Sequence, residues 1–119
     1  MKENIIKNKS FAFALRIVKA YQFLCEQKKE YVLSKQLLRS GTAIGAMVRE
    51  AEQAESSADF VHKMAIALKE ANESEYWIEL LSQSNYLEEK VSNSLKNDLT
   101  EILKLLTSII KTTKQNTKK

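Results

Sequence analysis

The sequence of 119 residues has no proline, two glycines, one cysteine and one histidine. Tight turns usually need proline and glycine, so their scarcity favours helices joined by a few short connections. One cysteine excludes an internal disulfide and a cysteine-based zinc site, and one histidine cannot supply a paired metal site or a nucleophile relay. We therefore expect an all-α protein without a metal or cofactor, in which Cys25 and His62 are ordinary helical side chains.

Long apolar runs are also missing. No stretch reaches membrane-spanning length and no signal-peptide pattern is present, so we expect a cytoplasmic protein without a membrane partner. Hydrophobic residues make up 44% and charged residues 29%, which is typical of a globular domain. A chain of this length buries a single core. The net charge of +4 and the pI near 9.1 modestly favour an anionic partner.

Apolar residues recur every three or four positions in four segments, which predicts four amphipathic helices. Their expected ranges are about 10–28, 34–54, 57–84 and 88–113. Because the connections are short, consecutive helices should be antiparallel neighbours in an up-down-up-down four-helix bundle that forms one domain over residues 1–119. From Lys111 the periodicity fades, and the basic end is predicted to be a disordered tail.

The two central helices carry the clearest local signals. Ser34 is a candidate N-cap, and Ser56 with Asp59 has the form of a capping box. Gly41 and Gly45 lie inside a predicted helix, where each costs about 1 kcal/mol relative to alanine, so we expect close approach by a neighbouring helix.

Glu75 interrupts the apolar stripe of the third helix. Two interpretations stay open: the carboxylate reaches solvent at the edge of the stripe, or it is buried in a hydrogen bond to Arg39 or Ser40.

Two runs from these helices, QLLRSGTAIGAMVREA and SSADFVHKMAIALKEANESEYWIELL, resemble a known family. It is the four-helix bundle family first noted in open reading frames within intervening sequences of bacterial 23S rRNA genes. That family is similar in turn to the accessory variability determinant of diversity-generating retroelements. The more specific parts are the Arg39-Ser40 pair, the stretch from Ile44 to Glu50, Asp59-Phe60 and a later glutamate. Members often have asparagine where Met47 stands and glycine where Ala51 stands, so no role of that asparagine carries over.

The resemblance implies a left-handed bundle that assembles as a ring, with a pentamer as the expected form. In the related retroelement protein the positive ring surface binds nucleic acid and a reverse transcriptase. The residues themselves independently favour a homo-oligomer, because two helices carry more apolar surface than one buried stripe needs. This excess lies at Tyr76-Trp77 in the third helix and at Leu103, Leu105 and Ile110 in the fourth.

Three functions are consistent with these features. The first is a non-enzymatic ring that binds the backbone of RNA or DNA through Lys7, Lys9, Arg16 and Arg39, since no motif for reading bases is present. The second is a protein-interaction module, for example a reverse transcriptase accessory protein. The third and weakest is a di-metal enzyme, because that site needs Glu-x-x-His on two helices and the chain has one histidine.

Overall fold

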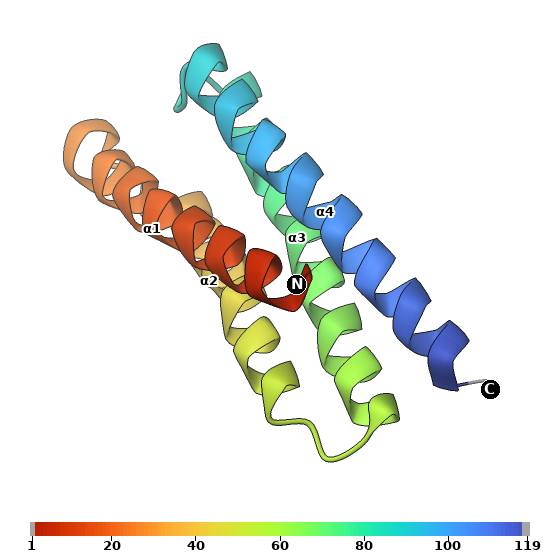
Figure 1. Ribbon diagram of the computed structural model, residues 1–119. Coiled ribbons are helices and arrows are strands. Elements are labelled where there is room, and N and C mark those ends of the chain that lie inside the picture. Colours follow the sequence, from red (N-terminus) through yellow and green to blue (C-terminus); the bar gives the residue numbers. More distant parts are fainter. Residues whose placement is uncertain (1, 118–119) are drawn as a thin grey trace.

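The computed structural model describes residues 2–117, with side chains from residue 4 onward, and this part of the chain forms four helices and no strand. Their bounds are α1 Lys2–Lys28, α2 Leu33–Glu52, α3 Ser57–Gln83 and α4 Glu89–Thr117. Figure 1 shows four long rods lying side by side, and the described chain measures 52 × 22 × 19 Å. The all-α prediction is confirmed.

Each helix packs against two others in the order α1, α2, α3, α4 and back to α1. The contacts of three of these pairs run in opposite sequence directions. Later residues of one helix meet earlier residues of the other at Ser10/Gly45 and Ile17/Gly41, at Ser40/Ser74 and Glu50/Lys63, and at Lys9/Glu101 and Arg16/Asp98.

One apolar core runs along the axis between the four helices, and it contains most of the predicted stripes. Residues buried there from all four helices include Phe13, Ile17, Leu37, Ile44, Met64, Ile78, Leu99 and Ile102. The α3 stripe departs from the prediction at one step, because Ser74 is buried while Glu75 is only partly covered. The Ser40 hydroxyl accepts a hydrogen bond from the Ser74 hydroxyl at 2.9 Å and donates to the Leu37 carbonyl, while Arg39 bonds Glu70 and Glu73. The interpretation of a buried Glu75 bond to Arg39 or Ser40 is therefore wrong.

The first helix begins at Lys2, well before the predicted start near residue 10. Ser10, expected near that start, is instead buried in mid-helix, where its hydroxyl donates to the Lys7 carbonyl. The physical reason is Ile6, which is fully buried and extends the core by one more turn. Burial of this apolar side chain therefore keeps the lysine-rich first turns of α1 helical.

The fourth helix continues to Thr117, so the predicted disordered tail is helical over residues 111–117. Ile109 remains buried and Ile110 packs against the core, which anchors the last turns. The hydroxyls of Thr113 and Thr117 each donate a hydrogen bond to the backbone carbonyl four residues earlier, as threonines in helices do. Lys118 and Lys119, the end of the predicted tail, lie outside the described residues.

The second helix begins at Leu33 and is not capped by Ser34. The Glu30 carboxylate instead accepts the backbone N–H groups of Val32, Leu33 and Ser34, at 3.2, 3.1 and 2.7 Å. Ser34 is buried and donates its hydroxyl to the Glu30 carbonyl at 2.8 Å. Burial alone would raise the pKa of Glu30, but these amide hydrogen bonds outweigh it and lower the pKa overall.

Two local predictions are confirmed. The Ser56 hydroxyl accepts the Asp59 N–H at 3.0 Å, and the Asp59 carboxylate returns to the Glu55 N–H at 3.3 Å, so the box begins α3 with a shift of one residue in its return bond. The glycines of α2 allow α1 to approach closely, because a Cβ on Gly41 would lie only 2.8 Å from the Ile17 side chain.

Candidate nucleic-acid interface

Each of the four cations predicted to contact nucleic acid forms an ion pair with a carboxylate on a neighbouring helix. The pairs are Lys7 with Glu52 at 3.3 Å, Lys9 with Glu101 at 2.6 Å, Arg16 with Asp98 at 2.6 Å, and Arg39 with Glu70 at 3.2 Å and with Glu73. They do not converge on one patch. Lys7 faces α2, Lys9 and Arg16 face α4, and Arg39 extends from α2 toward α3.

Lys9 and Arg16 join α1 to α4. Arg16 bonds Asp98 and also donates to the Ser94 hydroxyl at 3.0 Å, so its guanidinium spans one turn of α4. The hydrogen bond with Glu101 raises the pKa of Lys9, and the same bond lowers the pKa of Glu101. Both pairs are exposed to water, which screens their attraction, so they add little to stability.

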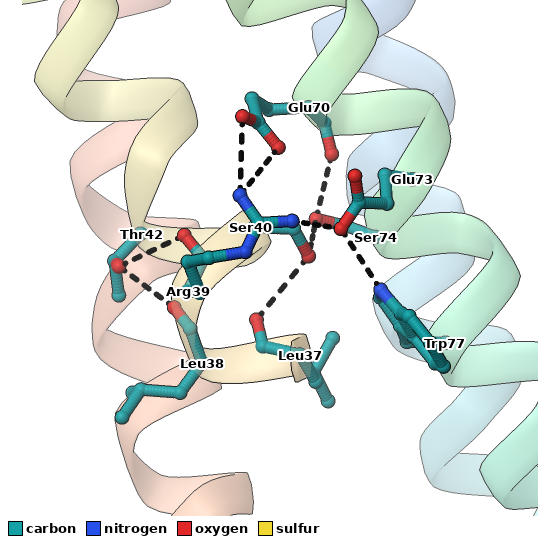
Figure 2. A network of polar contacts seen from close by, with 9 residues as sticks. All are labelled: Leu37, Leu38, Arg39, Ser40, Thr42, Glu70, Glu73, Ser74 and Trp77. Carbon is teal, nitrogen blue, oxygen red and sulfur yellow. Dashed lines mark hydrogen bonds and ion pairs between the residues drawn. The ribbon is translucent and has the colours of Figure 1, made fainter. Parts of the chain in front are cut away.

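Arg39 is the centre of a polar network between α2 and α3, which Figure 2 shows with its guanidinium directed at two carboxylates. One nitrogen reaches both Glu70 oxygens at 3.2 Å and the other reaches Glu73. The Trp77 indole N–H donates to the same Glu73 oxygen at 3.1 Å. That indole bond is the largest influence lowering the pKa of Glu73, followed by Arg39 after the opposing effect of burial.

Partial burial would lower the pKa of Arg39, but the hydrogen bond and attraction from Glu73 and Glu70 raise it overall. The two carboxylates outnumber the guanidinium, and Lys69, which also attracts Glu73, brings the local charge close to zero, so the network leaves no excess of positive charge. An incoming phosphate would have to displace these carboxylates. The geometry therefore gives Arg39 a structural role in the contact of α2 with α3.

The exposed lysines Lys104, Lys111 and Lys114 are arranged differently. They lie seven and three residues apart on α4, which places them on one side of the helix over about 15 Å. None has an ion pair with another side chain that the structure describes. Lys104 attracts Glu101, but that carboxylate is already bonded to Lys9. We call these three residues the α4 lysine row.

None of these three lysines was among the predicted contacts, although the sequence carries a signal for the row. Lys104 and Lys111 recur at an interval of seven, and Lys118 continues that interval in the sequence. Lysines at this spacing on one face of an amphipathic helix indicate a basic strip. The signal was missed because the segment from Lys111 was expected to be disordered, where spacing has no geometric meaning.

An apolar strip lies on the outer side of α1. Phe11, Leu15 and Val18 are 50%, 51% and 37% exposed, and their spacing of four and three residues puts them on one face. Leu15 is two residues from both Phe13 and Ile17, which are buried, so it points away from the core. The Arg49 guanidinium of α2 lies 5.2 Å from the centre of the Phe11 ring. We call Phe11, Leu15 and Val18 the α1 stripe.

The exposed apolar surface does not lie where it was predicted. Trp77, Leu103, Leu105 and Ile110 are partly buried and pack against the core, so they are not spare surface. Tyr76 is 59% exposed, with its ring edge-on to Trp77 at 5.0 Å. A larger group of exposed apolar side chains, the α1 stripe, lies instead on α1, whose outer face was not predicted to carry one.

Other chemistry is sparse in the described part of the chain. It contains no group of three or more His, Cys, Asp and Glu side chains that could hold a metal ion. None of its helices combines the length and apolar character needed to cross a membrane. Two adjoining hollows of about 570 and 410 Å³ lie where α1 and α4 separate. The first is lined mostly by polar side chains, including Lys28, Asn93 and Lys96, and the second mostly by apolar ones.

Comparison with known proteins gives a consistent result. A family model described as 23S rRNA-intervening sequence protein matches residues 2–108. A crystal structure of a protein with unknown function from the S23 ribosomal protein family of Bacteroides thetaiotaomicron is similar over 93% of this chain and 99% of that one, with 60% identity and a TM-score of 0.92. No curated protein matches the sequence.

Proposed function

Because the chain belongs to the family of 23S rRNA-intervening sequence proteins, we propose that it is a non-enzymatic bundle that assembles into a ring and binds the backbone of RNA or DNA. The helices run up-down-up-down in this proposal, and five copies form the ring. Both family names refer to the ribosome or its RNA, which makes structured RNA the first ligand to test.

The observation that carries the proposal is the α4 lysine row. Its three cations are exposed and have no described ion-pair partner. The predicted contacts Lys7, Lys9, Arg16 and Arg39, in contrast, each form an ion pair with a carboxylate of the bundle. A row of free ammonium groups attracts phosphates without reading bases. A ring repeats the row around its axis, so the field of the assembly exceeds that of one copy.

The test compares two variants of equal charge. Lys104→Gln, Lys111→Gln and Lys114→Gln together remove the row, and Lys28→Gln, Lys35→Gln and Lys69→Gln remove three exposed lysines from the other helices. Binding of an RNA hairpin is measured by fluorescence anisotropy between about 50 and 200 mM salt. The row variant should lose at least about tenfold in affinity and show a flatter salt dependence, while the control variant changes little.

If the wild-type protein binds neither RNA nor DNA at low salt, the proposal is wrong. If both variants lose affinity equally, binding follows net charge and the row is not the site. A triple variant of Lys7, Lys9 and Arg16 completes the comparison. It should affect RNA binding less than the row variant, because those cations already have carboxylate partners.

A second function is favoured by the apolar surface of α1. In this function the protein is an accessory module, and the α1 stripe recruits another protein, for example a reverse transcriptase. Affinity capture with and without nuclease separates the two functions. A protein that stays bound after nuclease treatment supports the accessory role, and a protein released by nuclease was held through nucleic acid.

A further inference from the structure

The α4 lysine row is part of a longer polar face of the same helix. In chain order this face consists of Thr100, Lys104, Thr107, Lys111 and Lys114, which follow one another at steps of four and three residues and are all exposed. At about 100° per residue they lie within about 80° of one another around the helix, and they extend over about 21 Å along it. We call these five residues the α4 outer face.

The charge of this part of α4 has one sign. Glu101 is the last acidic residue in the sequence, so residues 102–119 contain lysines and no carboxylate side chain. Glu101 and Asp98 are bonded to Lys9 and Arg16 of α1. Figure 1 shows α4 as an unbroken rod along one side of the bundle. Its outer face therefore complements a polyanion whose charges are dense and fixed in space.

The composition of α4 favours a paired nucleic acid over a single strand. Proteins that hold single strands stack the bases on aromatic side chains and on arginine, and α4 has neither kind of residue. The exposed aromatic residues Phe11, Phe23 and Tyr76 lie on other helices. A duplex needs no stacking partner, because its bases stack on one another. Duplex DNA, for example, carries about one charge per 1.7 Å of axis, which is about twice the density of one strand.

The two threonines distinguish RNA from DNA. The Thr100 hydroxyl donates to the Lys96 carbonyl at 3.0 Å, and the Thr107 hydroxyl donates to the Leu103 carbonyl at 2.8 Å. Each hydroxyl has one proton, so its oxygen is left to accept a hydrogen bond from outside. The ribose 2′-OH is a donor that an RNA duplex displays in its wide minor groove, and deoxyribose lacks it.

We infer that the α4 outer face binds double-stranded RNA, with its lysines on phosphates and its two threonine hydroxyls accepting hydrogen bonds from 2′-OH groups. The inference rests on the proposed function and names the form of nucleic acid that the lysine row takes. All of these contacts go to backbone and sugar, so the base sequence of the duplex should have little effect on affinity.

The experiment compares three ligands of about 20 nucleotides per strand, long enough to exceed the roughly 16 base pairs that a small duplex-binding domain spans. They are an RNA duplex, the DNA duplex of the same sequence, and one RNA strand that cannot pair with itself. Thr100→Val with Thr107→Val removes both acceptors and keeps the charge. Thr42→Val with Thr112→Val, at positions off the α4 outer face, is the matched control. Circular dichroism first establishes that both variants fold, and fluorescence anisotropy then gives the affinities.

The wild-type protein should bind the RNA duplex at least about fivefold more tightly than the DNA duplex, through the two added hydrogen bonds. It should bind the single strand most weakly. The variant of Thr100 and Thr107 should bind the RNA duplex only as tightly as the DNA duplex, with its affinity for DNA unchanged. The control variant should keep the preference of the wild type.

Equal affinity of the wild type for both duplexes, or tighter binding of the single strand, overturns the inference. So does a variant of Thr100 and Thr107 that keeps the preference for the RNA duplex. In each of these cases the proposed function stands if the lysine row variant still weakens binding. A wild-type protein that binds none of the three ligands contradicts both.

Discussion

Gly41 and Gly45 lie one turn apart on α2, but they leave different amounts of room. A Cβ on Gly41 would lie 2.8 and 2.9 Å from two carbons of Ile17, which is fully buried and cannot move aside. A Cβ on Gly45 would lie 3.4 Å from the Ser10 carbonyl oxygen, an ordinary contact distance. The same substitution should therefore have opposite effects at the two positions.

We expect Gly45→Ala to raise the free energy of unfolding by up to about 1 kcal/mol, through better helix propensity. Gly41→Ala should lower it by about 1 kcal/mol, because overpacking against Ile17 exceeds the same gain in propensity. Urea denaturation of the two variants measures both effects. Equal stabilisation of both variants would mean that α1 does not approach α2 closely at Gly41.

Glu30 is the residue whose protonation should be visible in stability. Its folded pKa is lowered below the ordinary 4.5, so its stabilising contribution is full above that value and is lost as pH falls through the folded pKa. Glu30→Gln imitates the protonated form. The variant should be about 1–2 kcal/mol less stable than wild type at pH 7, and this difference should vanish in acid.

The measurement is chemical denaturation of both proteins from pH 7 down to pH 3. Glu73 and Glu101 also have lowered pKa values, so only the difference between wild type and Glu30→Gln isolates this one group. A difference that stays constant over the whole range would show that the Glu30 carboxylate does not cap α2.

At the scale of elements, α1 is distinctive because it has apolar residues on two opposite faces. Its inner face supplies Ile6, Phe13, Ile17 and Leu24 to the core. Its outer face carries the α1 stripe, so the helix does not show the single apolar side of an ordinary surface helix. Such a helix is adapted to contacts on both sides.

The first turns of α1 provide a prediction at this scale. Ile6 is completely buried, so Ile6→Ala should lower the free energy of unfolding by about 2–4 kcal/mol. Ile5, its neighbour, is 43% exposed, and Ile5→Ala should cost less than about 1 kcal/mol. Thermal unfolding of the two variants compares them directly. Similar small losses for both variants would show that the first turns of α1 are frayed and do not pack on the core.

Much of this architecture could be predicted from periodicity alone. The ends of α2 and α3 and the start of α4 fall within two residues of expectation, because Ser56, the polar connections and regular apolar spacing mark them. The start of α1 and the end of α4 could not be predicted in the same way. The sequence there is charged and polar, which is typical of a disordered terminus. The helices extend into it because Ile6 and Ile109 are buried against the other helices, and a single sequence does not show that packing.

The candidate site was less predictable, for a physical reason. Lys7, Lys9 and Arg16 have partners 45, 92 and 82 positions away in the sequence, and no spacing within one helix reveals such pairs. Residue type identifies a cation, but only the packing of helices decides whether its charge remains available. The α4 lysine row remains available because none of its three lysines forms an ion pair with another described side chain.

At the scale of the whole molecule, two exposed surfaces differ in chemistry, and the proposed function uses them differently. The α1 stripe is apolar and would contact another protein chain, and the α4 lysine row would face the polyanion. The start of α1 and the end of α4 lie at the same end of the bundle, since α1 and α4 run in opposite directions. In a ring whose axis runs along the bundles, the lysine rows of all copies would therefore lie at one end.

The molar mass in solution tests the proposed function most directly, because the proposed binding surface is the lysine row repeated by assembly. Size-exclusion chromatography with multi-angle light scattering gives that mass without assuming a shape. The account predicts a multiple of the 13.6 kDa chain mass, with five copies giving about 68 kDa. A single species of 13.6 kDa at every concentration would contradict it.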